Sequence, residues 1–220
     1  MYLKKISLNF FVKVVWYRHP DSESFFIPIK DELSGDHCLT NFNIFLILLT
    51  KNSYRNSPLL IIEPPKGYGD FIKDMILTNV EEIGIAFSNV ALLAFDYYNI
   101  KKGLYLHLSP SEHCIACINK GKIVKIIDID DNESKPIVVE FSIPKVEKII
   151  DVLDKIITKV KNNLKIVLSI ECDSEKQTMD EFNSMKLLLK KYNIINDTPF
   201  HYLFAAQELS RSKDFSLLFE

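Results

Sequence analysis

The stretch 58–65 reads Pro-Leu-Leu-Ile-Ile-Glu-Pro-Pro and predicts a strand in the middle of a sheet. Its aliphatic part, Leu59–Ile62, is apolar on both faces, as a central strand is, and the two prolines end it. A second strand is predicted at Glu82–Phe87, and Ser88 is positioned to cap a helix at Asn89–Tyr98. This succession of strands and helices favours a mixed or parallel sheet with helices packed on it.

The next part of the chain contains three segments in which apolar and polar residues alternate, and these predict an antiparallel meander. They are Leu104–Leu108, Cys114–Ile118 and Lys122–Ile129, with Gly121 in the second turn. Elsewhere the same periodicities predict, in chain order, short strands within residues 3–30, helices at Asn41–Asn52 and Phe71–Leu77, a helix from Pro144 to Lys161, a buried strand at Lys165–Ile170, and helices at Gln177–Tyr192 and Tyr202–Leu209. The acidic segment Asp128–Ser134 is the predicted domain boundary.

The composition is typical of a globular protein, with 47% apolar and 25% charged residues in a chain of 220. The net charge of −2 provides no general attraction for nucleic acid or for an anionic membrane. No apolar run approaches the roughly 20 residues that span a bilayer, no signal-peptide pattern is present, and four cysteines do not make a disulfide scaffold. We therefore expect an intracellular protein of the nucleus or cytoplasm that contacts neither nucleic acid nor membrane.

The order and spacing of these segments resemble actin and the actin-related proteins. In that family an apolar strand ending in E-A-P precedes a helix containing A-I-Q-A-V-L-S-L-Y, as "PLLIIEPP" at 58–65 precedes "IGIAFSNVALLAFDYYN" at 83–99. The hairpin that ends in Asn119-Lys-Gly121 is similar to the family's second phosphate hairpin, which runs to Y-E-G. Residues 12–29 resemble the family's strand, charged turn and strand, residues 162–192 its unit around N-I-V-L-S-G-G, and residues 202–215 its C-terminal helix.

The resemblance implies an α/β fold of the actin-like (ribonuclease H-like) class, with mixed sheets and packed helices. The spacing from Phe26 to Phe45 leaves no room for the outer subdomain 2 of actins, and the short connection after Asp128 leaves none for subdomain 4. We therefore expect only the two lower subdomains. Residues 1–130 would form a subdomain 1-like region, and residues 131–220 a reduced subdomain 3-like region with a C-terminal segment that returns to the first.

The resemblance also locates the positions that hold phosphates in actins, and the residues found there argue against nucleotide binding. The first phosphate hairpin, D-x-G-S in actins, is replaced by Ser7-Leu-Asn-Phe-Phe11, and the second, D-S-G-D-G, by Leu108-Ser-Pro-Ser-Glu-His113. Pro110 removes a backbone N–H from the second hairpin. At about 4 Å and an effective dielectric constant near 20, the charge of Glu112 would repel a phosphate by about 4 kcal/mol.

Two further positions of the nucleotide site depart from the family pattern. The G-G pair that lies against adenosine in actins becomes Ile170-Glu171, and Asn89 or a neighbour replaces the glutamine that orients the attacking water. The last 99 residues contain no glycine, so the second half of the chain has no conventional phosphate-binding loop. We expect no catalytic residue, no bound cofactor and no metal, and hence a pseudo-ATPase rather than an enzyme.

Four other patterns are better interpreted as structural. The segment His113-Cys-Ile-Ala-Cys117 lacks the second pair of ligands of a zinc site, and its two cysteines would point to opposite faces of a strand. The acidic turn after Asp128 lacks the glycine of a calcium loop. The lysines of the helix that follows Pro144 have no interleaved arginines or aromatic residues, so they indicate a solvated face. His201, Ser210 and Asp214 form no nucleophile elbow.

Aromatic and aliphatic residues at the ends of two predicted helices indicate a partner-binding surface. In actins, the groove between the two lower subdomains is apolar and takes amphipathic helices from partners. By resemblance, this groove is bordered here by Tyr97, Tyr98, Phe204 and Leu209. The alternative interpretation is that these four residues belong to the core.

Together these features predict a non-catalytic actin-related scaffold subunit of a multi-protein assembly. Its partners would be proteins, either an amphipathic helix of a larger subunit or another actin-like protein. The resemblance suggests a chromatin-remodelling complex first and a dynactin-type filament cap, a cytoskeletal role, next. Two alternatives remain open: a small ATP-dependent enzyme of the wider actin-like or sugar-kinase fold with a modified site, and a likeness that reflects only generic α/β packing.

Overall fold

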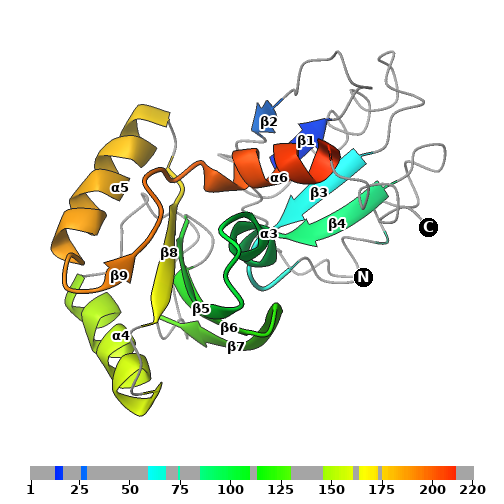
Figure 1. Ribbon diagram of the computed structural model, residues 1–220. Coiled ribbons are helices and arrows are strands. Elements are labelled where there is room, and N and C mark those ends of the chain that lie inside the picture. Colours follow the sequence, from blue (N-terminus) through cyan, green and yellow to red (C-terminus); the bar gives the residue numbers. More distant parts are fainter. Residues whose placement is uncertain are drawn as a thin grey trace, which may run out of the picture. The chain divides into compact units, whose positions relative to one another are not determined.

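The chain forms two compact units in the computed structural model (Figure 1), which describes residues 13–16, 26–28, 59–67, 74, 85–109, 113–129, 146–160, 164–172 and 175–211. One unit comprises Met1–Asn89 with Ala206–Glu220, and the other comprises Val90–Ala205. The division therefore falls at Asn89 and not at the expected residue 130. The physical reason is that the strands on both sides of residue 130 are hydrogen-bonded into one sheet.

The sheet of the first unit has four strands among the described residues, in the order β2-β1-β3-β4. They are β1 (Lys13–Trp16), β2 (Phe26–Pro28), β3 (Leu59–Glu63) and β4 (Ile85–Asn89). β1 runs antiparallel to β2 and β3, whereas β3 and β4 are parallel. The apolar segment 59–62 thus lies between two neighbours, which confirms the prediction of a central strand in a mixed sheet.

In the part of the second unit that the structure describes, the sheet has five strands in the order β7-β6-β5-β8-β9. They are β5 (Lys102–Leu108), β6 (His113–Asn119), β7 (Lys122–Asp128), β8 (Lys165–Ile170) and β9 (Asn193–Ile194). β6 is antiparallel to both of its neighbours, while β5, β8 and β9 run parallel. Numbered within the unit, the strands follow the order 3-2-1-4-5 with the second one reversed, which is the topology of the ribonuclease H-like fold.

Helices connect these strands and follow them, as Figure 1 shows. They are α3 (Val90–Tyr97), α4 (Val146–Val160), α5 (Glu175–Leu188) and α6 (His201–Arg211). α4 joins β7 to β8, and α5 joins β8 to β9. The predicted class, α/β with mixed sheets, packed helices and an actin-like strand order, is confirmed.

The central strands β5 and β8 of the second sheet are buried on both faces, and their period-2 alternation separates two kinds of side chain. On one face, leucines and isoleucines of β5 and β8 pack against α4 and α5 in a core of fully buried residues that includes Leu106, Leu168, Ile149, Leu153 and Phe182. The opposite face of β5 and β8 presents Tyr105, His107 and Ser169, which are also buried. The unit therefore has one apolar face and one face with a buried polar row.

Several predicted elements need correction or lie outside the described residues. Ser88 and Asn89 continue β4 and do not begin the helix, because they pair with Ile62 and Glu63 of β3. Asn89 Nδ2 also donates to the carbonyl oxygens of Pro64 and Pro65, at 3.1 and 3.0 Å. Of residues 3–30, where short strands are predicted, the structure describes 13–16 and 26–28. The predicted helix at Asn41–Asn52 lies outside the described residues, and of the predicted helix Phe71–Leu77 only Asp74 is described.

Among the described residues of the second unit, left-handed backbone occurs at Asn99 and at the turn Lys120–Gly121. At the end of α3, Asn99 has φ +50°, while Asn99 N–H donates to Asp96 O and Ile100 N–H to Phe95 O. This is the Schellman pattern that satisfies the last carbonyls of a helix.

No helix in the described part of the chain is long and apolar enough to cross a membrane.

Candidate functional site

The carboxyl ends of β5 and β8 are the part of the second unit where an actin-like protein would contact nucleotide. β5 ends at Leu108, and the following Ser109 is buried, with 1% of its surface exposed. Pro110 and Glu112, which sequence analysis placed at the hairpin tip, lie outside the described residues, as do residues 7–11 of the first hairpin. His113, on the other side of the turn, is half-buried.

Beside this turn, β8 ends in a similarly closed arrangement. Ile170 is 1% exposed, and Glu171 is 9% exposed. The backbone N–H of Glu171 donates to the carbonyl oxygen of Leu108 at 2.9 Å, which extends the pairing of β5 and β8 by one more bond. The backbone at the position of the actin G-G pair is therefore covered by side chains, and its amide is already used within the sheet.

Directly before these strand ends, a histidine and a serine lie on adjacent strands. His107 Nδ1 and Ser169 Oγ are 3.3 Å apart, and the two side chains are 2% and 0% exposed. A nucleophilic serine must reach a substrate, whereas both of these side chains are enclosed. The pair is consequently placed as a structural hydrogen bond inside the core.

The buried polar row continues to α6 through Tyr105. Its hydroxyl lies 3.1 Å from His201 Nε2, and both residues are fully buried. Burial raises the pKa of Tyr105 well above its ordinary value, with a further contribution from the charge of Glu171. The phenol thus remains protonated and can donate to the His201 ring.

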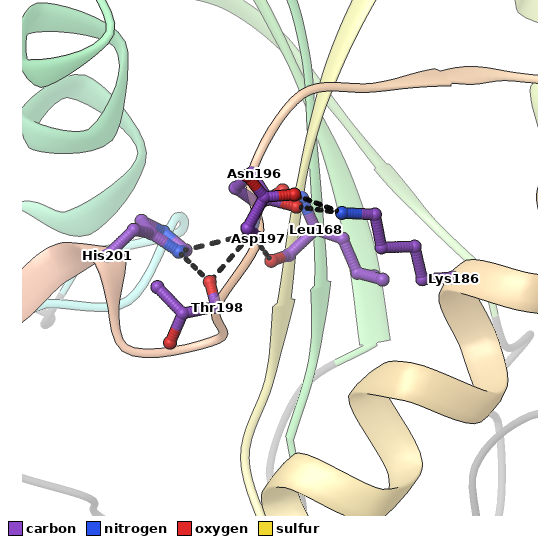
Figure 2. Close-up of polar contacts among 6 residues, drawn as sticks. All are labelled: Leu168, Lys186, Asn196, Asp197, Thr198 and His201. Carbon is purple, nitrogen blue, oxygen red and sulfur yellow. Dashed lines mark hydrogen bonds and ion pairs between the residues drawn. The ribbon is translucent and has the colours of Figure 1, made fainter.

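Asn196 lies on the other side of His201, with Asn196 Nδ2 at 3.5 Å from His201 Nδ1 (Figure 2). Asn196 Nδ2 donates to Leu168 O at 2.7 Å and to Thr198 O at 2.9 Å, and Asn196 Oδ1 accepts from Leu168 N–H at 2.9 Å. Since both amide hydrogens are used, we assign the His201 proton to Nδ1, which is 3.4 Å from Thr198 O. His201 Nε2 then accepts from Tyr105.

A lysine of α5 fixes the same segment from outside. Lys186 Nζ donates to Asn196 O at 2.8 Å and to Asp197 Oδ1 at 2.6 Å. This hydrogen bond lowers the pKa of Asp197. Sequence analysis missed the network, because an asparagine in a short turn gives no sign that it bonds to a strand 28 residues away.

Three of the four predicted groove residues belong to the second unit. Tyr97 and Tyr98 make an edge-to-face pair with ring centroids 4.9 Å apart, and the Tyr98 ring lies 6.3 Å from that of His201. Phe204 is 47% exposed on the next turn of α6. Leu209, which is half-buried, is further along the same helix and belongs to the other unit. The structure thus brings Tyr97 and Tyr98 to the start of α6.

Tyr98 has a polar environment as well as an apolar one. Burial raises the pKa of its phenol to about 12, and the neighbouring Tyr97 and the charge of Asp197 add to this shift. Tyr98 therefore carries a neutral hydroxyl at physiological pH and can donate one hydrogen bond. A half-buried tyrosine with an apolar ring and a polar tip is common at protein interfaces.

Cys114 and Cys117 lie on opposite faces of β6, as the sequence predicted. Cys114 is buried, whereas Cys117 packs against the apolar core on the other face of β6. Burial raises the pKa of the Cys117 thiol. Among the residues that the structure describes, no group of three or more His, Cys, Asp or Glu side chains could hold a metal ion.

Comparisons with known proteins give a similar structure but no sequence relative. No protein-family description matches the chain, and neither does any curated protein. Among solved structures, the chain is similar to the ethanolamine utilization protein EutJ from Carboxydothermus hydrogenoformans, with 14% sequence identity and a TM-score of 0.49. The match covers 83% of this chain and 76% of that one.

Proposed function

We propose that this actin-like chain is a non-catalytic scaffold subunit of a protein assembly. The observation that carries the proposal is the closed end of β5 and β8. Ser109 and Ile170 are each 1% exposed there, and the Glu171 amide is bonded to Leu108. A triphosphate needs free backbone N–H groups and close approach to glycine, and the described residues at this end of the sheet, 107–109 and 169–172, provide no such glycine-lined backbone.

Charge supports the same proposal. Glu171 is a carboxylate at the position where actins have the second glycine of their G-G pair, and its charge is felt by the buried Tyr105. A phosphate or an adenine ring placed here would meet a side chain and a like charge instead of bare backbone. The His107–Ser169 pair offers no substitute, because both of its side chains are enclosed.

The nucleotide claim is tested by a thermal melt of the full chain with and without MgATP. A ligand at 100 times its dissociation constant stabilises a protein by about 2.7 kcal/mol, which is a clear rise in Tm. We expect no rise with MgATP or MgADP. A rise that saturates with nucleotide would overturn the proposal and favour a small ATP-dependent enzyme with a modified site.

The partner-binding part of the proposal concerns Tyr97, Tyr98 and Phe204, which belong to the second unit, and Leu209, which lies further along α6 and belongs to the other unit. Phe204 is a large apolar side chain that is nearly half exposed, and the aromatic pair Tyr97 and Tyr98 lies near the start of its helix. Aromatic residues are enriched in interface cores. An amphipathic helix of a larger subunit, or another actin-like protein, is the proposed occupant.

The choice of assembly is tested by purifying the tagged protein from its own cells. We propose a chromatin-remodelling complex as the first expectation and a dynactin-type filament cap as the second. The Phe204→Ser variant, changed on α6, should no longer co-purify with a stoichiometric partner. The control Leu187→Ser, which changes an exposed leucine of α5, should still co-purify with it. If both variants retained the partner equally, the proposed role of Phe204 in partner binding would be wrong, whichever assembly is recovered.

A further inference from the structure

A cavity lies at the amino end of β5, away from the strand ends discussed above. It has a volume of about 400 Å³ and is lined by Phe95, Asp96, Asn99, Ile100, Lys101, Lys120 and Gly121. All of these residues belong to the second unit. This volume is in the range of small-molecule sites. From Lys102 to Leu108, β5 rises by about 20 Å, so the cavity is about that far from the carboxyl end of the strand.

The cavity has walls of defined shape. One wall is the Schellman end of α3, where Ile100 folds back on Phe95, and these two residues are 7% and 1% exposed. The other wall is the two-residue turn between β6 and β7, where Lys120 and Gly121 have φ values of +52° and +70°. Gly121 N–H donates to Lys101 O at 3.4 Å and so links the two walls.

Lys120 is an unusual residue for its position. A two-residue turn with both φ values positive strongly prefers asparagine, aspartate or glycine at its first position, because the Cβ of an L residue is strained at positive φ and these residues tolerate that backbone best. A strained residue that persists is a reason to look for a function of its side chain. Lys120 is one of the residues that line the cavity.

The charge around the cavity is positive. Lys101 and Lys120 line the cavity. Lys102 and Lys122 are exposed and lie beside it, because both pair with Asn119, the neighbour of Lys120. Asp96 is the acidic residue among the lining residues, and burial raises the pKa of its carboxyl. In a chain of net charge −2, four lysines around one hollow are a local excess of positive charge.

We propose that this cavity binds a small polyanion, a compound with at least two phosphate or carboxylate groups. The ammonium groups of Lys101 and Lys120 would pair with the anionic groups, and Lys102 and Lys122 would add long-range attraction. Asn99 and the Asp96 carboxyl would provide hydrogen bonds to the body of the ligand. This site is independent of the nucleotide positions of the actin-like fold and of the proposed scaffold role.

The proposal is tested with inorganic tripolyphosphate as the probe, by titration of the full chain followed by NMR and calorimetry. We expect saturable binding, with amide shifts centred on residues 96–101 and 119–122. Lys120→Asn retains the left-handed turn and should weaken binding several-fold without lowering Tm, and Lys101→Ala should also weaken it. Lys159→Ala, which removes an exposed lysine from α4, is the matched control and should bind as the unmodified chain does.

Each remaining outcome would overturn the site. Shifts spread over all exposed lysines, or equal weakening by Lys159→Ala, would show nonspecific charge attraction. An unchanged affinity in Lys120→Asn would show that the lysine has no binding role. Absence of saturable binding to tripolyphosphate, together with binding of an acidic peptide, would identify the surface as a protein contact.

Discussion

Gly103 is a residue whose side chain is excluded by its neighbours. A Cβ at this position would lie 2.4 Å from the carbonyl oxygen of Lys165 and 3.1 Å from the Phe95 ring. Real Cβ atoms do not approach backbone at that distance, so β5 and β8 would have to separate. Glycine here lets two parallel strands pair while α3 packs on them.

We predict that Gly103→Ala lowers the free energy of unfolding by about 1–3 kcal/mol, the usual cost of overpacking. Urea denaturation measures the effect as a lower midpoint. Gly121→Asn is the control, since a Cβ there meets nothing within 4 Å and asparagine tolerates its φ of +70°. Equal midpoints for Gly103→Ala and the unmodified chain would contradict the close approach.

The hydrogen bond between Tyr105 and His201 should contribute to stability. Tyr105→Phe retains the ring but removes the hydroxyl that lies 3.1 Å from His201 Nε2. Loss of one partner of a buried polar group costs about 1–3 kcal/mol, and thermal or urea unfolding should show a loss of that size. Tyr97→Phe, at a half-exposed position, should change stability by much less. A Tyr105→Phe protein as stable as its control would contradict the buried hydrogen bond between Tyr105 and His201.

Among secondary-structure elements, the sequence predicted those with strong local periodicity. Apolar residues at helical spacing, at positions 149, 153, 156 and 160, predicted α4, and the alternation of apolar and polar residues predicted the hairpin of β5 and β6. Both patterns depend only on residues that are close in sequence. The start of α3 was predicted too early, since Ser88 and Asn89 have good capping side chains but are paired with β3. Tertiary pairing overrode the local signal.

The polar part of the candidate site could not be predicted in this way. Tyr105 and His201 are 96 residues apart, and His107 and Ser169 are 62 apart. Each of these side chains is ordinary for a strand or helix, and only the topology brings them together. The two-residue strand β9 was also missed, because it is defined by its pairing with β8 and is too short to show a period.

The contact between α4 and the end of α5 gives a prediction about pH. Hydrogen bonds from Lys191 and Tyr192 lower the pKa of Asp154 from its ordinary value. For a depressed carboxyl pKa, the stabilisation is present above the unfolded value and is lost as pH falls through the folded value. We predict that Lys191→Ala raises the Asp154 midpoint in an NMR pH titration, and that Lys190→Ala, its exposed neighbour, leaves it unchanged. No difference between the two would mean that the pair does not persist in solution.

At the scale of the whole molecule, the second unit has the features of an independent domain. Its apolar core is formed by residues between Leu104 and Leu189, and the described strands of its sheet all belong to the second unit. The polar row from His107 to His201 is also contained in it. In contrast, the sheet of the first unit shares no described strand with this core.

We therefore predict that residues 90–211, which keep α6 complete, fold without the rest of the chain. The fragment should unfold cooperatively, and its amide NMR spectrum should superimpose on that of the full chain for β5–β8, because the hydrogen bonds and burial of those strands come from within the fragment. Leu153→Ala, which truncates a side chain with 0% exposure, is the control and should lower the Tm of fragment and full chain alike, by an amount that corresponds to about 2–5 kcal/mol. An unfolded fragment would show that the ribonuclease H-like sheet depends on residues 1–89, and the division at Asn89 would then not be one between folding units.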